Sequence, residues 1–132
     1  GYLPGGGIAL LRLSAALDDF PTANEDQATG VKILQRALKA PFYQIVANGG
    51  NTPEVIEAQV MTYVGEGNFH TGYDASTNKI ENMIHMGIVD PAKVTRVALQ
   101  NAASIAGIFL TTEVVIGWDG EDKTDNLSFL AN

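Results

Sequence analysis

Three consecutive glycines, Gly5-Gly6-Gly7, precede an apolar stretch with helical spacing and are the first candidate for ligand chemistry. Glycine lets the backbone approach a ligand closely, and the free N–H groups at a helix start attract anions. The run lacks the Gly-Lys-Ser/Thr ending of a phosphate-binding loop, and no strand precedes it, as a dinucleotide fingerprint would require. Two interpretations stay open, an anion site and a flexible entry into a helix, and the motif alone favours the second.

Two aspartates stand where a carboxylate could serve either a ligand or the backbone. Asp90 precedes Pro91, a pairing that predicts a helix N-cap, although a second carboxylate oxygen could still accept from a ribose or bind a metal. Asp74 begins the turn-forming residues 74–78, where an aspartate by default hydrogen-bonds its own turn. Sequence alone therefore favours structural roles for both, without excluding a ligand.

The two histidines and the methionines carry weaker signals. His70 and His85 lie fifteen residues apart, without the spacing of a helical zinc pair, so we expect exposed or capping side chains rather than metal ligands. We expect Met83 and Met86 to fill the core beside a turn. No serine–histidine–aspartate arrangement can be argued from the spacing. The sequence predicts no catalytic residue and no metal site.

The composition excludes several classes of function. Hydrophobic residues make up 45% and charged residues 17% of 132 residues, which is typical of a globular chain. The formal net charge of -7 argues against nucleic-acid binding and against docking on an anionic membrane. No stretch approaches the length of a membrane span. The absence of cysteine excludes disulfides and thiolate chemistry.

The hydrophobic periodicity predicts a mainly α-helical fold. We expect a first helix over residues 7–17 and a second that begins at Asn24, with Gln27 completing a capping box. Pro41 is expected to kink or interrupt this second helix, which ends at residues 48–50. A third helix is expected over residues 52–63.

The second half of the chain predicts a hairpin, a long helix and a strand. Residues 69–80 favour a small β-hairpin. A helix beginning at Asp90 carries an apolar stripe that we expect to be buried, formed by Val94, Val97, Ala98, Ile105, Ile108 and Phe109. Residues 113–117 favour an edge strand that needs a partner from elsewhere, and residues 118–132 a flexible polar tail.

Five linked motifs carry a resemblance to a known family. They are residues 3–10, 23–27, 72–75, 86–96 and 111–113. In order and spacing they resemble the C-terminal part of group I chaperonins, the family of bacterial, mitochondrial and plastid sixty-kilodalton heat-shock proteins. The resemblance extends to about Gly117, so it implies that residues 1–117 are the C-terminal half of the equatorial, ATP-binding domain.

The resemblance implies an adenosine site. It places Gly6 near the ribose, Asp74 and Ala75 at the adenine edge, Ile88 over the base, and Asp90 as acceptor from the ribose hydroxyls. An apolar wall with a few polar contacts suits a base, and a carboxylate suits a diol. Two departures stand out: many members have asparagine in place of Asp74, and His70-Thr71 resembles a small insertion.

The resemblance also implies partners and a division of labour. We expect the parent protein to be an ATP-driven folding chaperone of two seven-membered rings, with magnesium-dependent hydrolysis and with unfolded clients and a co-chaperonin bound by other domains. The phosphate loop, the magnesium ligand and the catalytic aspartate of the family lie in segments outside this sequence. We therefore expect this chain alone to be inactive. Bacterial cytoplasm is the expected location, with mitochondrial matrix or plastid stroma as alternatives.

A second hypothesis is a non-enzymatic assembly fragment that no longer handles nucleotide. Asp74, the His70-Thr71 insertion and the lack of the first half of the equatorial domain in this sequence motivate it. Under either hypothesis, half a domain is expected to expose apolar surface.

Overall fold

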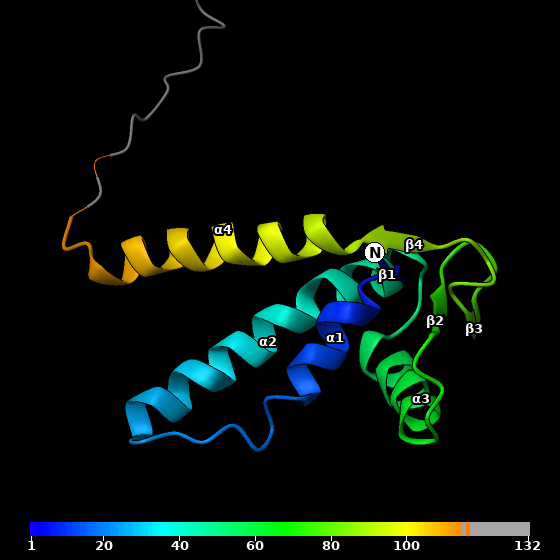
Figure 1. The fold of residues 1–132 in the computed structure, drawn as a ribbon, viewed down its shortest axis with the longest axis horizontal. Coiled ribbons are helices and arrows are strands. Elements are labelled where there is room, and N and C mark those ends of the chain that lie inside the picture. Colours follow the sequence, from blue (N-terminus) through cyan, green and yellow to red (C-terminus); the bar gives the residue numbers. More distant parts are fainter. Residues whose placement is uncertain (115, 117–132) are drawn as a thin grey trace, which may run out of the picture. The chain divides into compact units, whose positions relative to one another are not determined.

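The structure, a computed structural model, describes residues 1–114 and 116. The chain divides into a first unit, Gly1–Ala98, and a second unit, Leu99–Asn132. As predicted, the described residues are mainly helical with small antiparallel sheets. Their elements, coloured in chain order in Figure 1, are β1 (Tyr2–Pro4), α1 (Ile8–Ala15), α2 (Glu25–Asn48), α3 (Pro53–Gly65), β2 (Thr71–Asp74), β3 (Lys79–Asn82), β4 (Val89–Pro91) and α4 (Ala92–Thr111).

The start of α2 confirms the predicted cap. Asn24 is extended, and its side-chain Oδ1 accepts from the Gln27 N–H at 2.9 Å. The Gln27 side chain returns to the backbone N–H of Ala23 at 2.8 Å, one residue earlier than in a strict capping box. The helix ends, as predicted, where Gly49 and the left-handed Gly50 follow Asn48.

Pro41 does not interrupt α2, which runs continuously from Glu25 to Asn48. An interior proline costs about 3 kcal/mol because it removes a backbone hydrogen bond and crowds the preceding turn. Leu38, Phe42 and Val46 lie on one face of the helix on both sides of Pro41, and all three are buried. Full burial of each contributes about 1.5–3 kcal/mol, so the three together outweigh the proline.

The predicted hairpin forms between β2 and β3. Their antiparallel register pairs Tyr73 with Ile80 and Asp74 with Lys79, leaving residues 75–78 as the loop. Gly72 on β2 packs so tightly that an ideal Cβ there would lie 2.6 Å from both Ile8 Cγ1 and Met83 Cγ. The hairpin is thereby held directly against α1.

A second pair of strands was not predicted, and it corrects the expectation that no strand precedes the glycine run, because β1 ends at Pro4 directly before Gly5. The N-terminal strand β1 pairs antiparallel with β4, which places Leu3 opposite Asp90 and Pro4 opposite Val89 (Figure 1). Each strand has only three residues, too few to show the alternation by which strands are recognised in a sequence. This pairing is what brings the glycine run to the segment that contains Ile88 and Asp90.

One core cluster holds α1, α2, α3 and β2 together. Its buried members are Ile8, Leu11, Phe42, Val46, Val60 and Tyr73. They come from four elements, so each element contributes one apolar face to the same interior. Met83 is also fully buried, as predicted, whereas Met86 is 48% exposed and is not a core residue.

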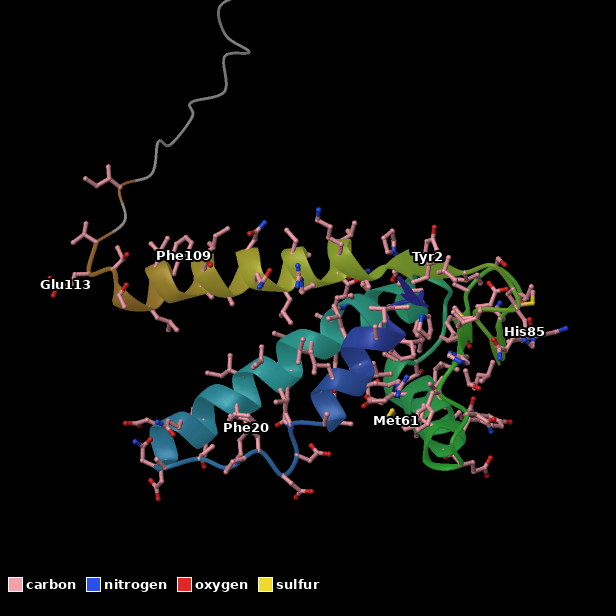
Figure 2. The ribbon with its side chains drawn as sticks, in the orientation of Figure 1. Tyr2, Phe20, Met61, His85, Phe109 and Glu113 are labelled. Atoms are coloured by element: carbon pink, nitrogen blue, oxygen red, sulfur yellow. The ribbon has the colours of Figure 1, made fainter. Side chains whose placement is uncertain are left out.

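The helix α4 corrects two expectations. It begins at Ala92, because Asp90 and Pro91 belong to β4, so Asp90 is not its N-cap. No residue of α4 is buried, and the predicted buried stripe is exposed at Val94, Ile105, Ile108 and Phe109 (Phe109 is labelled in Figure 2). Helical periodicity identifies an apolar side and does not say what covers it.

The predicted strand over residues 113–117 is not formed by Glu113, Val114 or Ile116, the members that the structure describes. Val115, Gly117 and the predicted tail, residues 118–132, lie outside the described residues. Among the described residues no helix is both long and apolar enough to cross a bilayer.

Candidate functional site

The glycine run lies directly against the segment before β4. The N–H of Gly5 donates to the carbonyl oxygen of Ile88 at 2.9 Å. An ideal Cβ on Gly5 would lie 3.1 Å from Ile88 backbone atoms, so only a residue without a side chain fits comfortably. The hydrogen bond and the β1–β4 pairing therefore place residues 5 and 88 side by side, although 83 positions separate them in the sequence.

Gly6 joins this contact to the hairpin. It has a left-handed backbone with φ of 71°, and an ideal Cβ would lie 2.9 Å from Met83 Cε and 3.4 Å from the Tyr73 carbonyl oxygen. That carbonyl belongs to the residue immediately before Asp74. Met83 in turn accepts at its carbonyl oxygen from the Ile88 N–H at 2.8 Å. Gly6 is thus adjacent to both the hairpin and the segment that leads to Asp90.

The Asp74 carboxylate is engaged within its own turn, as the default interpretation of the sequence predicts. Oδ1 accepts from the backbone N–H and the hydroxyl of Ser76 at 2.8 and 2.7 Å, and Oδ2 accepts from the Thr77 hydroxyl at 3.0 Å. These bonds, those from Ser76 first, stabilise the charged form and lower the pKa of Asp74. Asp74 is 6% exposed, so little of the residue is accessible to a ligand.

The remaining candidates are partly accessible. Ala75, Ile88 and Asp90 are each half-buried. Gly6 packs against β2, which ends in Asp74, and its neighbour Gly5 contacts Ile88. All five candidates lie in the first unit, and these two contacts connect their segments there.

The histidines take no part in this arrangement. His70 and His85 are both exposed, as expected, and the His85 side chain points away from the ribbon in Figure 2. Within residues 1–114 and 116, no three acidic or histidine side chains are grouped so that they could hold a metal ion.

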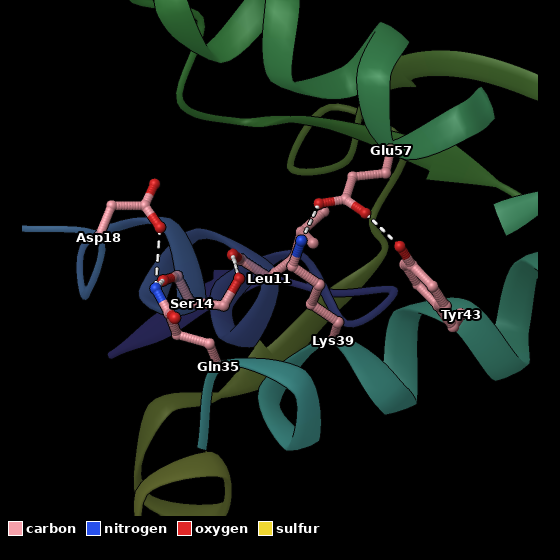
Figure 3. Close-up of polar contacts among 7 residues, drawn as sticks. All are labelled: Leu11, Ser14, Asp18, Gln35, Lys39, Tyr43 and Glu57. Atoms are coloured by element: carbon pink, nitrogen blue, oxygen red, sulfur yellow. Dashed lines mark hydrogen bonds and ion pairs between the residues drawn. The ribbon is translucent and has the colours of Figure 1, made fainter. Parts of the chain in front are cut away.

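A separate groove of about 1210 Å³, which the sequence did not indicate, lies between α1, α2 and α3. None of the five candidates lines it. Its polar contacts are drawn in Figure 3: Gln35 Nε2 donates to Asp18 Oδ1 at 2.8 Å, and Lys39 Nζ pairs with Glu57 Oε1 at 2.7 Å.

Glu57 has two partners in this groove. Tyr43 donates its hydroxyl to Glu57 Oε2 at 2.5 Å, and Lys39 holds the other oxygen. Burial raises the pKa of Glu57, but the bonds from Lys39 and Tyr43 together outweigh burial and lower it. Burial, followed by the bond to Glu57 and the charges of Glu57 and Glu54, raises the pKa of Tyr43 to about 12.

The raised pKa of Tyr43 predicts a loss of stability at high pH. Because the folded pKa lies above the ordinary value of 10, the contribution is complete below pH 10 and is lost as pH rises toward about 12. We expect the urea midpoint of the wild type to fall more steeply across this range than that of Tyr43→Phe. Equal slopes would show that Tyr43 ionises as freely in the folded chain as in the unfolded one.

Comparison with known proteins identifies a family and a similar fold. Residues 1–119 match the TCP-1/cpn60 chaperonin family. A solved structure, the open state monomer of a group II chaperonin from Methanococcoides burtonii, has a similar fold, with a TM-score of 0.77 at 20% sequence identity. The similarity covers 84% of this chain and 28% of that one. This chain therefore spans less than a third of the length of that relative.

Proposed function

Because the chain belongs to the TCP-1/cpn60 chaperonin family, we propose that it is the C-terminal half of the equatorial domain of a group I chaperonin and supplies its adenine and ribose contacts. The group I assignment rests on the five linked motifs, since the group II likeness, at 20% identity, concerns the fold alone. The parent protein is then an ATP-driven folding chaperone assembled as two seven-membered rings.

One observation supports the nucleotide site above the others. Gly5 and Gly6, which we call the glycine hub, lie between two segments: Gly5 donates to the Ile88 carbonyl, and Gly6 packs near the Tyr73 carbonyl. A base and a ribose joined together need contacts from several directions within a few ångströms. The hydrogen bond from Gly5 to Ile88 and the close packing of Gly6 against the Tyr73 carbonyl support such an arrangement, because they join residues distant in the sequence to the same glycines.

Each candidate has a role that suits its chemistry. Gly6 leaves backbone open to the ribose, and Ile88 supplies an apolar wall for the base. Asp90, half-buried on β4, accepts hydrogen bonds from the ribose hydroxyls. Since the Asp74 carboxylate is engaged by Ser76 and Thr77, we assign the adenine-edge contact to the backbone of Asp74 and Ala75.

Phosphate chemistry belongs to other parts of the parent protein under this proposal. Hydrolysis needs a magnesium ion that neutralises the developing charge and a group that positions the attacking water. The candidates offer one acceptor carboxylate and apolar surface. Clients and the co-chaperonin would likewise be bound by other domains. We propose bacterial cytoplasm as the location, with mitochondrial matrix or plastid stroma as alternatives.

Nucleotide titration of the chain tests the proposal. We expect no ATP turnover and weak binding, in the millimolar range, because phosphate contacts are lacking. Adenosine should perturb the backbone amide resonances of Gly6, Ala75, Ile88 and Asp90 in NMR spectra. Micromolar affinity or turnover by the pure chain would contradict the proposed division of labour.

A non-enzymatic assembly role is the second candidate. The internal bonding of the Asp74 carboxylate favours it, because this side chain has no need of a nucleotide to be satisfied. The same titration separates the two functions. Adenosine-dependent shifts confined to the five candidates support nucleotide contact, whereas an unchanged spectrum at saturating adenosine supports assembly alone.

A further inference from the structure

A polar cluster outside the candidate residues links the hairpin loop to the connection between α2 and α3. Tyr73 is 2% exposed, yet its hydroxyl donates to Asn78 Oδ1 at 2.5 Å. Asn51, in the α2–α3 connection, donates its side-chain N–H groups to the Tyr73 hydroxyl at 2.9 Å and to Asn78 Oδ1 at 3.0 Å. These three residues, which we call the clip, form a closed triangle of hydrogen bonds.

The backbone at the end of α2 is shaped to receive the clip. An ideal Cβ on Gly49 would lie 2.6 Å from the Tyr73 hydroxyl oxygen, so the hydroxyl rests directly on the helix end. Asn51 Nδ2 also reaches the Gly49 carbonyl oxygen at 3.2 Å. The ring of Tyr73 is anchored in the core cluster and its hydroxyl is anchored at the α2–α3 connection.

The backbone of Asn78 has a left-handed conformation that contacts with other residues must stabilise. Its φ of 57° is the one left-handed value found at a residue other than glycine in the described part of the chain. Asparagine tolerates this region better than most residues, but still at a cost. Two hydrogen bonds to its Oδ1, from Tyr73 and Asn51, offset that cost and hold the last loop residue in place.

The clip and the Asp74 carboxylate constrain the loop from opposite ends. Asp74 binds Ser76 and Thr77, which closes the first part of the loop on itself. The clip holds Tyr73, immediately before Asp74, and Asn78, at the end of the loop. Since the Tyr73 carbonyl also faces Gly6, any movement of the clip would shift the backbone of Asp74 and Ala75 relative to the glycine hub.

The following inference rests on the proposed nucleotide function. We propose that the clip positions the backbone of Asp74 and Ala75 to contact the edge of the adenine base. Asn51 is then a positioning residue for base recognition. The side chain of Asn51 hydrogen-bonds to Gly49, Tyr73 and Asn78 and to none of the five candidates. It acts through Tyr73 and Asn78, and the α2–α3 connection thereby influences which base is accepted.

The test compares adenosine with inosine, which differs at the base edge, by NMR titration of the 132-residue chain. We expect Asn51→Ala and Asn78→Gly to reduce the preference for adenosine over inosine about two- to tenfold, the effect of losing one or two hydrogen bonds. Glycine at position 78 keeps the left-handed backbone accessible, so this variant removes the acceptor without adding strain. Asn78→Asp keeps an acceptor and should retain the preference.

Asn48→Ala is the matched control, because Asn48 lies at the same helix end and accepts only an exposed bond from Gln44 at 2.7 Å. It should leave the preference unchanged. A purely structural role of the clip predicts a lower melting temperature with equal losses for both nucleosides, and that result would overturn the proposal.

Amide hydrogen exchange of residues 74–79 separates this proposal from the proposed function. Faster exchange in Asn51→Ala and Asn78→Gly, but not in Asn48→Ala, is expected if the clip holds the loop. Unchanged exchange overturns the clip even if adenosine binds. If adenosine causes no spectral change in the wild type, the proposed function and the base-recognition role of the clip are both overturned. Faster exchange in the two variants would then show that the clip only stabilises the structure of the loop.

Discussion

Replacing Gly7 by alanine is expected to lower the free energy of unfolding by about 2–5 kcal/mol, combining backbone strain with overpacking. Gly7 has φ of 77°, where a residue with a Cβ is strained. An ideal Cβ there would also lie 2.8 Å from the backbone N and Cα of Phe42, a core residue in the middle of α2. Backbone atoms cannot rotate away as a flexible side chain can.

Urea denaturation followed by circular dichroism measures this effect, and Gly30→Ala is its matched control. Gly30 lies within α2, and a Cβ there would meet nothing within 4 Å. This control is expected to raise the free energy of unfolding by about 0.5–1 kcal/mol, because alanine loses less conformational entropy in a helix. If Gly7→Ala and Gly30→Ala unfolded at the same urea concentration, the inference that Gly7 at the start of α1 packs closely on α2 would be wrong.

The Asp90→Asn substitution is expected to weaken adenosine binding about 10- to 100-fold, the effect of losing charge-assisted hydrogen bonds. Asp90 pairs with Leu3 through backbone groups of β4 and β1. The substitution therefore keeps the strand pairing and the side-chain size while it removes the charge. Adenosine lacking the vicinal ribose diol should bind wild type and variant equally, since the two hydroxyls from which the carboxylate would accept are absent.

Titration calorimetry at high chain concentration compares these variants, with Asp19→Asn as the control. Asp19 is exposed in the connection between α1 and α2 and is expected to leave adenosine affinity unchanged. Equal affinities of wild type and Asp90→Asn for adenosine would remove Asp90 from the site. Equal weakening by both substitutions would point to the general negative charge of the chain instead.

Local signals predicted both ends of α2, the start of α3 and the presence of the hairpin, but not the start of α4. Asn24 stands where α2 begins, Gly49 and Gly50 where it ends, and Pro53 where α3 begins. These signals are readable because a cap or a turn is satisfied by residues only a few positions away. The resemblance added the chaperonin family, which the match of residues 1–119 to the TCP-1/cpn60 family confirms, whereas the group I assignment stays a proposal.

Three features that the sequence did not predict share a different cause. The uninterrupted course of α2 through Pro41, the β1–β4 pairing and the exposure of the apolar stripe of α4 all depend on residues distant in the sequence. Phe42 and Val46 can outweigh a proline only where a core receives them. Strands of three residues have no period of their own, so β1 is defined by its partner.

The sequence by itself determined the helical character of the chain, the hairpin, the family and the candidate residues Gly6, Asp74, Ala75, Ile88 and Asp90. Only the tertiary structure decided that Asp90 belongs to a strand, that the Asp74 carboxylate is engaged in its own turn, and that the glycine run adjoins both segments. The physical reason is the range of the interactions. Caps and turns are local, whereas the contacts that join Gly5 and Gly6 to residues 73 and 88 form only after the chain between them has packed.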